Sequence, residues 1–236
     1  MRAGSRFAIY FAPEEDTALA RFGWPWLGRR PDSDADAPFP AAVAGDVRHA
    51  AIVAAPQLYG LHGTLKPPFH LRDRTARAEL LTALQAFCAT RRPFASEPLV
   101  LGEIGGFLAL LPPRESGALH DLAADCVTAF DRFRAPASAE DIAKRVAQGL
   151  TPRQRALLDR WGYPYVLDEF RFHVTLTDRL DDAERSRVRG LLDSLLDKVA
   201  GERVQFRSLC LFEQPRPGSR FILAARVPFR NAPAKA

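Results

Sequence analysis

The sequence predicts an α+β fold of two lobes, built from two copies of a strand–helix–strand–strand unit. Three observations lead to this prediction. The motif H-x-T-L occurs twice, at His62 and at His173. Each copy is followed by an amphipathic helical pattern, and each helical pattern is followed by two short apolar runs that flank a turn. We therefore expect two antiparallel sheets that form a central cleft, with helices on the outside and a helical insert between the units.

A single bilobal domain is expected to account for residues 1–236. Its lobe segments lie at about 5–112 and 169–230, and the insert lies at about 113–168. With 47% hydrophobic and 26% charged residues, the chain has the composition of an ordinary folded protein that buries a substantial core.

Charge, cysteine content and hydropathy restrict the class of protein. The net charge of +5 and the pI near 9.4 favour anionic partners such as phosphates or nucleic acid. The three cysteines are far apart, which indicates neither a zinc ribbon nor a disulfide framework. The opening stretch lacks the form of a signal peptide, and no apolar run reaches the length of a membrane span. We expect a cytoplasmic protein without membrane association. The oligomeric state stays open, with a monomer favoured.

Two segments precede the first motif. Apolar side chains alternate in a strand expected at residues 5–13, and Tyr10 lies on the opposite face from them. We interpret the segment from Arg21 to Val47 as an irregular loop that is anchored by Trp24 and Trp26.

The first motif lies in YGLHGTLKPPF, from Tyr59 to Phe69. Alternation along a strand places His62, Thr64 and Lys66 on one face. After this strand we expect one helix and then the two strands of a hairpin, at residues 72–89, 98–104 and 106–112.

The insert contains three helical patterns, at residues 116–134, 138–149 and 151–162. Ser138 and Thr151 are the predicted N-caps of the second and third helices. Gln154 completes a capping box with Thr151.

The second motif lies in DEFRFHVTLTD, residues 168–178. As a strand, this segment turns one set of side chains to the core, namely Phe170, Phe172, Val174 and Leu176. The opposite face carries Arg171, His173, Thr175 and Thr177. A helix at residues 181–200, capped by Asp181 with Glu184 as its third-position partner, and strands at 204–213 and 220–229 complete the unit.

Two histidines that face one cleft provide a general base and a general acid without a metal. Imidazole titrates near neutrality, so one ring can be neutral while the other is protonated. A threonine two residues along a strand projects from the same face, about 6–7 Å away, and its hydroxyl can donate to a phosphate oxygen. Lys66 and Arg171 could add positive charge, and Tyr10 could contact a substrate.

The duplicated unit with HGTL and HVTL resembles the 2H phosphoesterase superfamily, which includes RNA 2′,3′-cyclic phosphodiesterases and 2′-5′ RNA ligases. Four segments, YGLHGTLKPPF, DRFRAP, WGYPYV and FRFHVTLT, are similar to a bacterial branch described only in terms of phosphonate metabolism. The resemblance implies a cleft lined by His62, Thr64, His173 and Thr175, and metal-independent hydrolysis of a phosphodiester without a cofactor. It also suggests a small cyclic phosphate as substrate, either of the 2′,3′-cyclic nucleotide type or a phosphoribose 1,2-cyclic phosphate. An RNA end stays possible as substrate, although the insert could close the cleft to polymers.

Other interpretations of the motifs remain open. The histidines could lie on the wet faces of unrelated strands, or the cleft could bind RNA or another anionic ligand without chemistry. A metallohydrolase would need clustered ligands at short spacing, and the sequence has no such array. The sequence does not identify the substrate, the role of the insert, or which histidine acts as base and which as acid.

Overall fold

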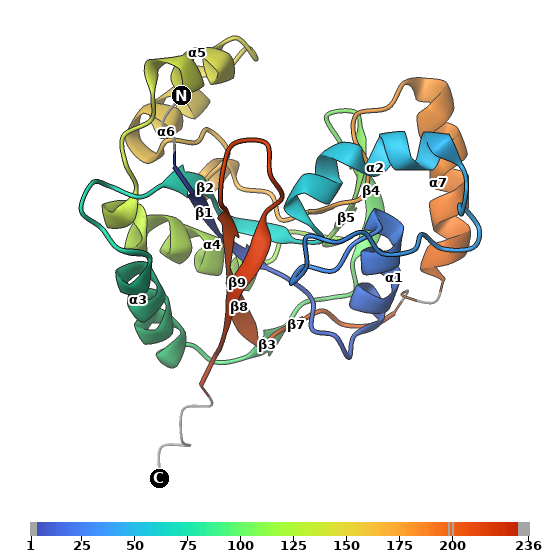
Figure 1. The fold of residues 1–236 in the computed structure, drawn as a ribbon, viewed down its shortest axis with the longest axis horizontal. Coiled ribbons are helices and arrows are strands. Elements are labelled where there is room, and N and C mark those ends of the chain that lie inside the picture. Colours follow the sequence, from blue (N-terminus) through green and yellow to red (C-terminus); the bar gives the residue numbers. More distant parts are fainter. Residues whose placement is uncertain (1–3, 198, 200, 231–236) are drawn as a thin grey trace.

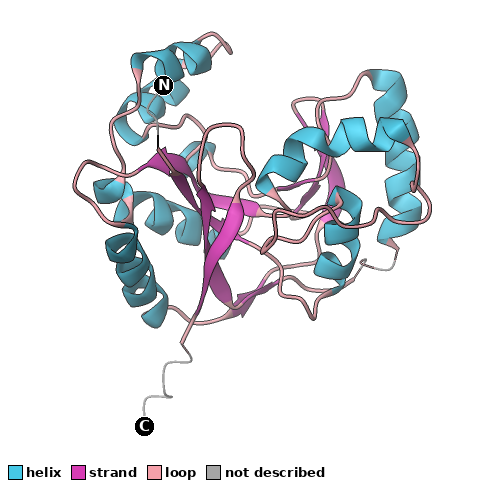
Figure 2. Ribbon diagram, in the orientation of Figure 1, coloured by secondary structure: helices cyan, strands magenta, loops and turns pink. Residues whose placement is uncertain are grey.

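The computed structural model describes residues 4–197, 199 and 201–230. It confirms the α+β prediction, with one large antiparallel sheet, a small second sheet and helices on the outside (Figures 1 and 2). The large sheet has the strand order β4-β5-β6-β2-β1-β8-β9, and the small sheet pairs β3 with β7.

The strands are β1 (Arg6–Phe11), β2 (Gly63–His70), β3 (Phe94–Ala95), β4 (Val100–Ile104), β5 (Phe107–Leu111), β6 (Val174–Thr175), β7 (Gln205–Phe206), β8 (Ser208–Gln214) and β9 (Ile222–Pro228). The helices are α1 (Ala18–Leu27), α2 (Val47–Tyr59), α3 (Arg77–Ala89), α4 (Gly117–Ala129), α5 (Ala139–Val146), α6 (Pro152–Trp161) and α7 (Asp182–Leu196). Within the described residues, no helix is both long enough and apolar enough to cross a bilayer.

The duplicated unit is present as β2-α3-β3-β4-β5 and β6-α7-β7-β8-β9. The two copies exchange parts, because β5 of the first copy pairs with β6 of the second. Helix α3 of the first copy packs on β8 and β9 of the second, whereas α7 packs on β5. Each half of the large sheet therefore combines strands from both copies, and β2 and β6 meet at the junction between the halves.

Helices gather at the two ends of this sheet (Figure 1). α1, α2 and α7 lie near β4 and β5, and α3 to α6 lie at the other end. One continuous core of buried apolar side chains joins β1, α1, α2, β2 and both copies of the unit. The predicted caps of the insert and of the last helix are confirmed: Ser138, Thr151 with Gln154, and Asp181 each accept a bond from the third residue of their helix.

The interpretation of Arg21–Val47 as one irregular loop is wrong at its start. Residues up to Leu27 belong to α1, whose N-cap is Thr17, although the helix contains Pro25. The helix is not evident from the sequence, because it contains Gly23 and Pro25, and glycine and proline disfavour helix interiors. Burial of Trp26, whose Nε1 donates to the Leu176 carbonyl at 2.8 Å, favours the helix despite the local preference.

The second motif forms a shorter strand than expected. Only Val174–Thr175 pairs as β6, and Leu167–Glu169 form a 3-10 turn instead of the start of a strand. The alternation nevertheless holds, because Phe172, Val174 and Leu176 are buried in the core. The last part of the helix predicted at 181–200 includes residues 198 and 200, which lie outside the described residues.

Candidate functional site

The two motifs meet where β2 pairs with β6. The antiparallel register sets Gly63 opposite Val174. One further residue in each direction sets His62 opposite Thr175 and Thr64 opposite His173. Directly opposed residues project from the same face of a sheet. The fold therefore brings the two H-x-T pairs together as a crossed set on neighbouring strands.

His62 has a defined tautomer. Its Nδ1 donates to the Gly60 carbonyl at 2.9 Å, so Nε2 carries the lone pair and accepts a bond from the Thr64 hydroxyl at 3.1 Å. The ring lies 4.0 Å from the Tyr10 ring and 6.0 Å from the Tyr59 ring, measured between centroids. Desolvation by this surrounding lowers the pKa of His62 to about 4. The bond to Gly60 opposes this shift, and the nearby charges of His173 and Arg29 contribute to it in the same direction as desolvation.

His173 repeats the backbone anchor of His62. Its Nδ1 donates to the carbonyl of Arg171, two residues earlier, at 2.8 Å. Its ring faces Phe107 at 5.8 Å, and desolvation lowers its pKa from the ordinary value. Both imidazoles are thus held by the carbonyl at position i−2, an arrangement that turns Nε2, rather than Nδ1, away from the backbone as the nitrogen for chemistry.

The threonines of the second strand have separate roles. Thr175 is half-buried, pairs with Ala109 of β5 and lines the same cleft as His62 and Thr64. Thr177 is buried, and its hydroxyl accepts from the Leu108 amide and donates to the Asp178 carbonyl. Thr177 therefore joins β5 to the segment after β6.

Tyr10 supports the ring of His62. Its own ring is buried in a small cluster with Phe212 and Phe221, and its hydroxyl has no hydrogen-bond partner among the described residues. Burial raises the pKa of Tyr10 well above the ordinary value, so the hydroxyl remains a donor. Tyr10 borders the cleft, as does Thr64, its cross-strand partner.

The expectation that Lys66 shares a face with Thr64 is wrong. Thr64 pairs with Tyr10, whereas Lys66 pairs with Ile9, because a β-bulge shifts the register between them. A bulge adds one residue and turns the following side chains to the other face. Lys66 is therefore buried under α4, where Nζ donates to the Val127 carbonyl at 3.0 Å and lies 3.6 Å from Asp131. Desolvation lowers its pKa to about 8.

Arg171 is exposed, and the structure gives its side chain no polar partner in the described part of the chain. Its carbonyl, rather than its guanidinium, contributes to the site by holding His173. A substrate-binding role for the Arg171 side chain stays a prediction.

The cleft around His62, Thr64 and Thr175 has a volume of about 620 Å³. Its walls carry more basic than acidic side chains; the basic ones are Arg6, Arg134, Lys144, Arg145 and Arg179, and the acidic ones are Asp141 and Asp178. A smaller cavity of about 270 Å³, lined mainly by apolar residues near the end of α7, contains no residue of either H-x-T pair.

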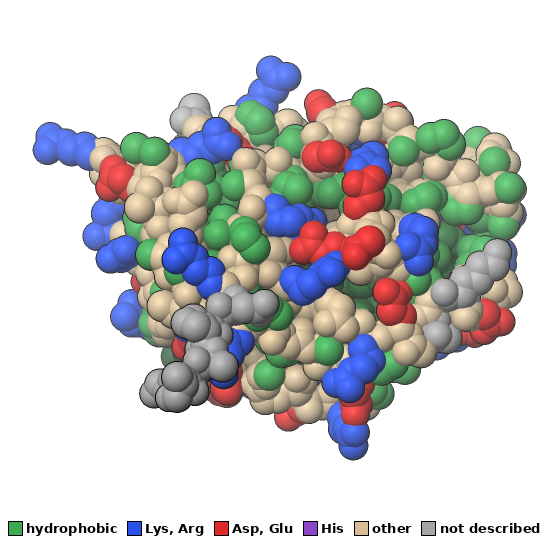
Figure 3. All heavy atoms as spheres, turned by 90° about the horizontal axis from the view of Figure 1, so that it is seen from below, with side chains coloured by type: hydrophobic (Ala, Val, Ile, Leu, Met, Phe, Trp, Pro, Cys, Tyr) green, Lys and Arg blue, Asp and Glu red, His purple; other side chains and the backbone are tan. Residues whose placement is uncertain are grey.

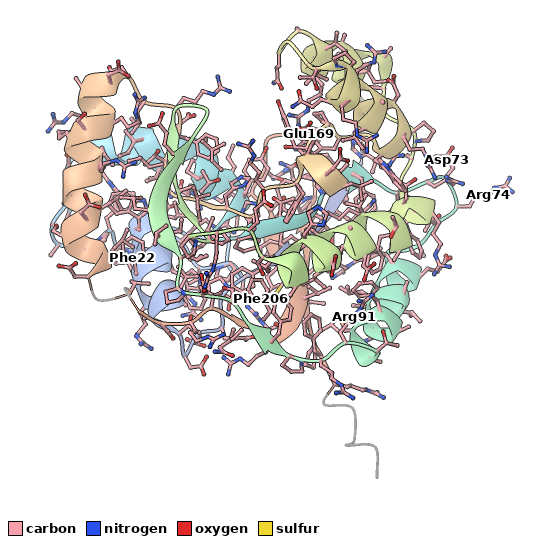
Figure 4. All side chains as sticks on the ribbon, turned by 180° about the vertical axis from the view of Figure 1, so that it is seen from behind. Phe22, Asp73, Arg74, Arg91, Glu169 and Phe206 are labelled. Carbon is pink, nitrogen blue, oxygen red and sulfur yellow. The ribbon has the colours of Figure 1, made fainter. Side chains whose placement is uncertain are left out.

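The insert supplies one wall of this cleft. The sequence suggested that the insert could close the cleft, but no motif marked the residues that form the wall. Helix α5 contributes Lys144 and Arg145, and the guanidinium of Arg145 lies 4.8 Å above the Tyr163 ring. The insert is tied to the second motif because Gln154 of α6 donates to Glu169 at 2.9 Å. Figure 4 shows Glu169 just below the insert helices, with the β4–β5 hairpin across from them.

Arg179 lies on the opposite wall, beside the turn at Gly105 that joins β4 to β5. Its guanidinium has no side-chain hydrogen-bond or ion-pair partner among residues of the described ranges, whereas Arg6 donates to the Gln214 amide oxygen and Arg134 pairs with Asp131. No sequence pattern marked Arg179, because a single arginine after a strand is usually a solvated surface residue. Among the described residues, no group of three histidine, cysteine or acidic side chains is arranged to hold a metal ion.

Comparisons with known proteins identify relatives of the chain. A family model described as "Protein of unknown function (DUF1045)" matches residues 64–222. Ribose 1,5-bisphosphate phosphokinase PhnN of Janthinobacterium sp. (strain Marseille) is 35% identical over 234 residues, which cover 95% of this chain and 51% of that protein. The protein of the same name in Laribacter hongkongensis (strain HLHK9) is 32% identical over 224 residues, which cover 94% of this chain and 51% of the relative.

The chain thus spans about half the length of the curated relatives it matches. A solved structure described as the crystal structure of a phosphoesterase is similar over 96% of this chain and 98% of that chain, with 12% identity and a TM-score of 0.38. Because the matched stretch makes up well over half of the 236 residues, the chain belongs to the DUF1045 family.

Proposed function

We propose that the protein is a metal-independent phosphodiesterase of the 2H type that opens a small cyclic phosphate. The observation that carries this proposal is the crossed pairing of His62 with Thr175 and of Thr64 with His173 at the β2–β6 junction. Two imidazoles with matched backbone anchors and adjacent hydroxyls fit acid–base cleavage of a phosphodiester.

His62 is assigned as the general base. A base must be neutral, and the low pKa of His62 keeps Nε2 unprotonated over most of the pH range. The Thr64 hydroxyl donates to this lone pair. When a phosphate oxygen enters, the hydroxyl can donate to that oxygen instead, which frees Nε2 to take a proton from water.

His173 is assigned as the general acid. The negative charge of a bound phosphodiester favours imidazolium over imidazole, so substrate raises the pKa of His173. Water then attacks phosphorus as His62 takes its proton, the P–O bond to the leaving oxygen breaks, and His173 Nε2–H protonates that oxygen. The product is a phosphomonoester beside a free hydroxyl. Proton exchange with solvent restores both rings.

The basic walls of the cleft support an anionic substrate. Both curated relatives are named for ribose 1,5-bisphosphate, so a phosphorylated ribose that carries a 1,2-cyclic phosphate is one candidate substrate. A nucleoside 2′,3′-cyclic phosphate presents the same reacting group and is the other. A role in phosphonate breakdown follows for the first candidate only.

A non-catalytic anion-binding module is the alternative outcome. A broad nucleic-acid surface would show basic side chains over a continuous area. On the face seen from below in Figure 3, acidic and basic side chains are interspersed instead. This distribution favours a ligand small enough for the cleft over a polymer on that face.

The deciding experiment is a hydrolysis screen of the purified protein with EDTA present. The panel contains nucleoside 2′,3′-cyclic phosphates, phosphoribose 1,2-cyclic phosphate and a short RNA with a cyclic phosphate end, and the double variant His62→Ala/His173→Ala is the control. We expect turnover of at least one small cyclic phosphate by the wild type and none by the double variant. Binding without turnover, retained in the double variant and weakened by salt, would establish the non-catalytic alternative.

A further inference from the structure

Arg29 is a buried arginine whose hydrogen-bond partners are all backbone carbonyls. It follows Gly28, the C-cap of α1, and only 1% of its surface is exposed. The guanidinium has five N–H donors, and five carbonyls accept from it at 2.8 to 3.5 Å, those of Arg30, Ser33, Gln57, Leu58 and Phe221. None of these partners is a carboxylate.

A buried charge without a bonded counter-ion costs stability, so its presence calls for a reason. Carbonyls at the C-terminus of a helix carry partial negative charge, and Gln57 and Leu58 lie at the C-terminus of α2. These carbonyls compensate the guanidinium in part. Burial lowers the pKa of Arg29 to about 10, which still leaves it charged at neutral pH.

Two of the five bonds, to the Gln57 and Leu58 carbonyls, hold the end of α2, from which the chain turns into the first motif. Leu58, which Arg29 holds, is followed by Tyr59, Gly60, Leu61 and His62. The carbonyl of Leu58 also accepts from the Phe221 amide at 2.7 Å, so α2 is joined at the same point to the residue just before β9. Gly60 has a φ of 76°, and a Cβ placed there would lie 3.8 Å from the Arg29 guanidinium carbon, which is therefore packed against the turn.

This turn presents the acceptor that sets the state of His62. The Gly60 carbonyl accepts a hydrogen bond from Nδ1–H of His62, and Tyr59 stacks on Phe221 at 5.3 Å to form the wall beside the ring. The titratable and charged groups that act on His62 come from four elements or their ends: Tyr10 of β1, Tyr59 of α2, His173 before β6 and Arg29 after α1.

We propose that Arg29 is a positioning residue that fixes the Gly60 carbonyl, and through it the Nδ1–H tautomer and orientation of His62. This inference rests on the proposed role of His62 as base for its kinetic consequence only. The tautomer can be measured without any activity. A second effect accompanies the first, because a fixed positive charge nearby disfavours protonation of the ring.

The test measures the ring nitrogen shifts and the titration of His62 by NMR in ¹⁵N-labelled wild type, Arg29→Lys and Arg29→Met. In wild type we expect one Nδ1–H tautomer and a pKa far below the ordinary value of about 6.5. In Arg29→Met we expect a mixture of tautomers and a higher pKa for His62, with His173 unchanged. Arg220→Gln is the matched control, because Arg220 bonds the side chain of Gln57 and leaves the five carbonyls untouched.

Arg29→Lys keeps the charge but has three donors at one point instead of a planar fork. It should fold, retain a low pKa for His62 and show altered ring nitrogen shifts. With a substrate from the screen, we expect kcat to fall about tenfold in Arg29→Met and less in Arg29→Lys, with KM nearly constant. A mixed tautomer in wild type, or wild-type nitrogen shifts in both folded Arg29 variants, would overturn the inference. Should Arg29→Met fail to fold, Arg29→Lys decides. Absence of any turnover in wild type would refute the proposed function and leave the NMR result valid.

Discussion

The two H-x-T segments have nearly the same sequence, yet the fold gives them different surroundings. The first lies at the start of an eight-residue strand between β1 and β6, with Tyr10 and Tyr59 around its histidine. The second lies at a two-residue strand, with Phe107 near its histidine. Burial lowers the pKa of both rings, and His62 has in addition a threonine hydroxyl on Nε2. The repeated motif thus supplies two histidines and two threonines of the same kind, whereas the neighbouring aromatic residues give the two histidines different environments.

The largest loss of kcat/KM is expected when either histidine of the two motifs is replaced. His62→Ala and His173→Ala should each lower kcat/KM by about 10²–10⁴, the usual loss for a general acid or base. Turnover within a few-fold of wild type in either variant would show that the two motifs are not a catalytic pair.

The same variants can also separate base from acid. A diester with a nitrophenolate leaving group needs no protonation of that group as it departs. With this substrate the loss in His173→Ala should shrink strongly, and the loss in His62→Ala should persist. The opposite pattern would exchange the two assigned roles.

The next effect concerns pH. His62 works as base when it is neutral, so kcat/KM should rise as pH increases through its pKa of about 4. His173 works as acid when it is protonated, so kcat/KM should fall as pH increases through a pKa below about 6.5. The maximum is expected on the acidic side of neutrality. Tyr10→Ala should shift the low-pH limb to higher pH, because exposure of His62 to water raises its pKa. Phe107→Ala should shift the high-pH limb to higher pH for the same reason at His173.

Substitution of the two motif threonines is expected to lower kcat less than substitution of the histidines. Thr64→Val and Thr175→Val keep the side-chain shape and remove one hydroxyl donor each. We expect kcat to fall about tenfold to a hundredfold in each, the value of one hydrogen bond to a charged transition state. Only Thr64→Val should alter the NMR signal of the His62 ring without substrate, since Thr64 and not Thr175 bonds that ring. Equal changes of the His62 signal in Thr64→Val and Thr175→Val would contradict the expected difference between the two threonines.

The smallest effects on kcat and KM are expected for substitutions of the basic residues Arg179 and Lys66. Arg179→Ala should raise KM about threefold to tenfold, because it removes a guanidinium that borders the cleft and lacks a described partner. Lys66→Met should leave kcat and KM within about twofold of wild type, because the ammonium lies under α4 on the other face of β2. A large increase of KM in a normally folded Lys66→Met variant would indicate that Lys66 contacts substrate in the cleft.

Patterns of period and repetition were sufficient for most of the fold. The duplicated unit, the N-terminal strand and the capped helices of the insert all follow from the spacing of apolar residues and from cap residues such as Ser138 and Thr151. The helix that contains Trp24 and Trp26 was missed because its proline and glycine argue locally for a loop. Its stability depends on distant partners such as Leu176, which no local window includes.

The candidate site divides in the same way. The repeated motif, together with the family resemblance, selected His62, Thr64, His173 and Thr175, because side-chain period and residue chemistry are local properties. A bulge in β2 decided the face of Lys66, and the return of the insert over the sheet decided that Arg145 borders the cleft. Register shifts and long-range contacts depend on which strands and helices become neighbours. The sequence by itself therefore determined which groups are available for chemistry, and only the tertiary structure decided their burial and their partners.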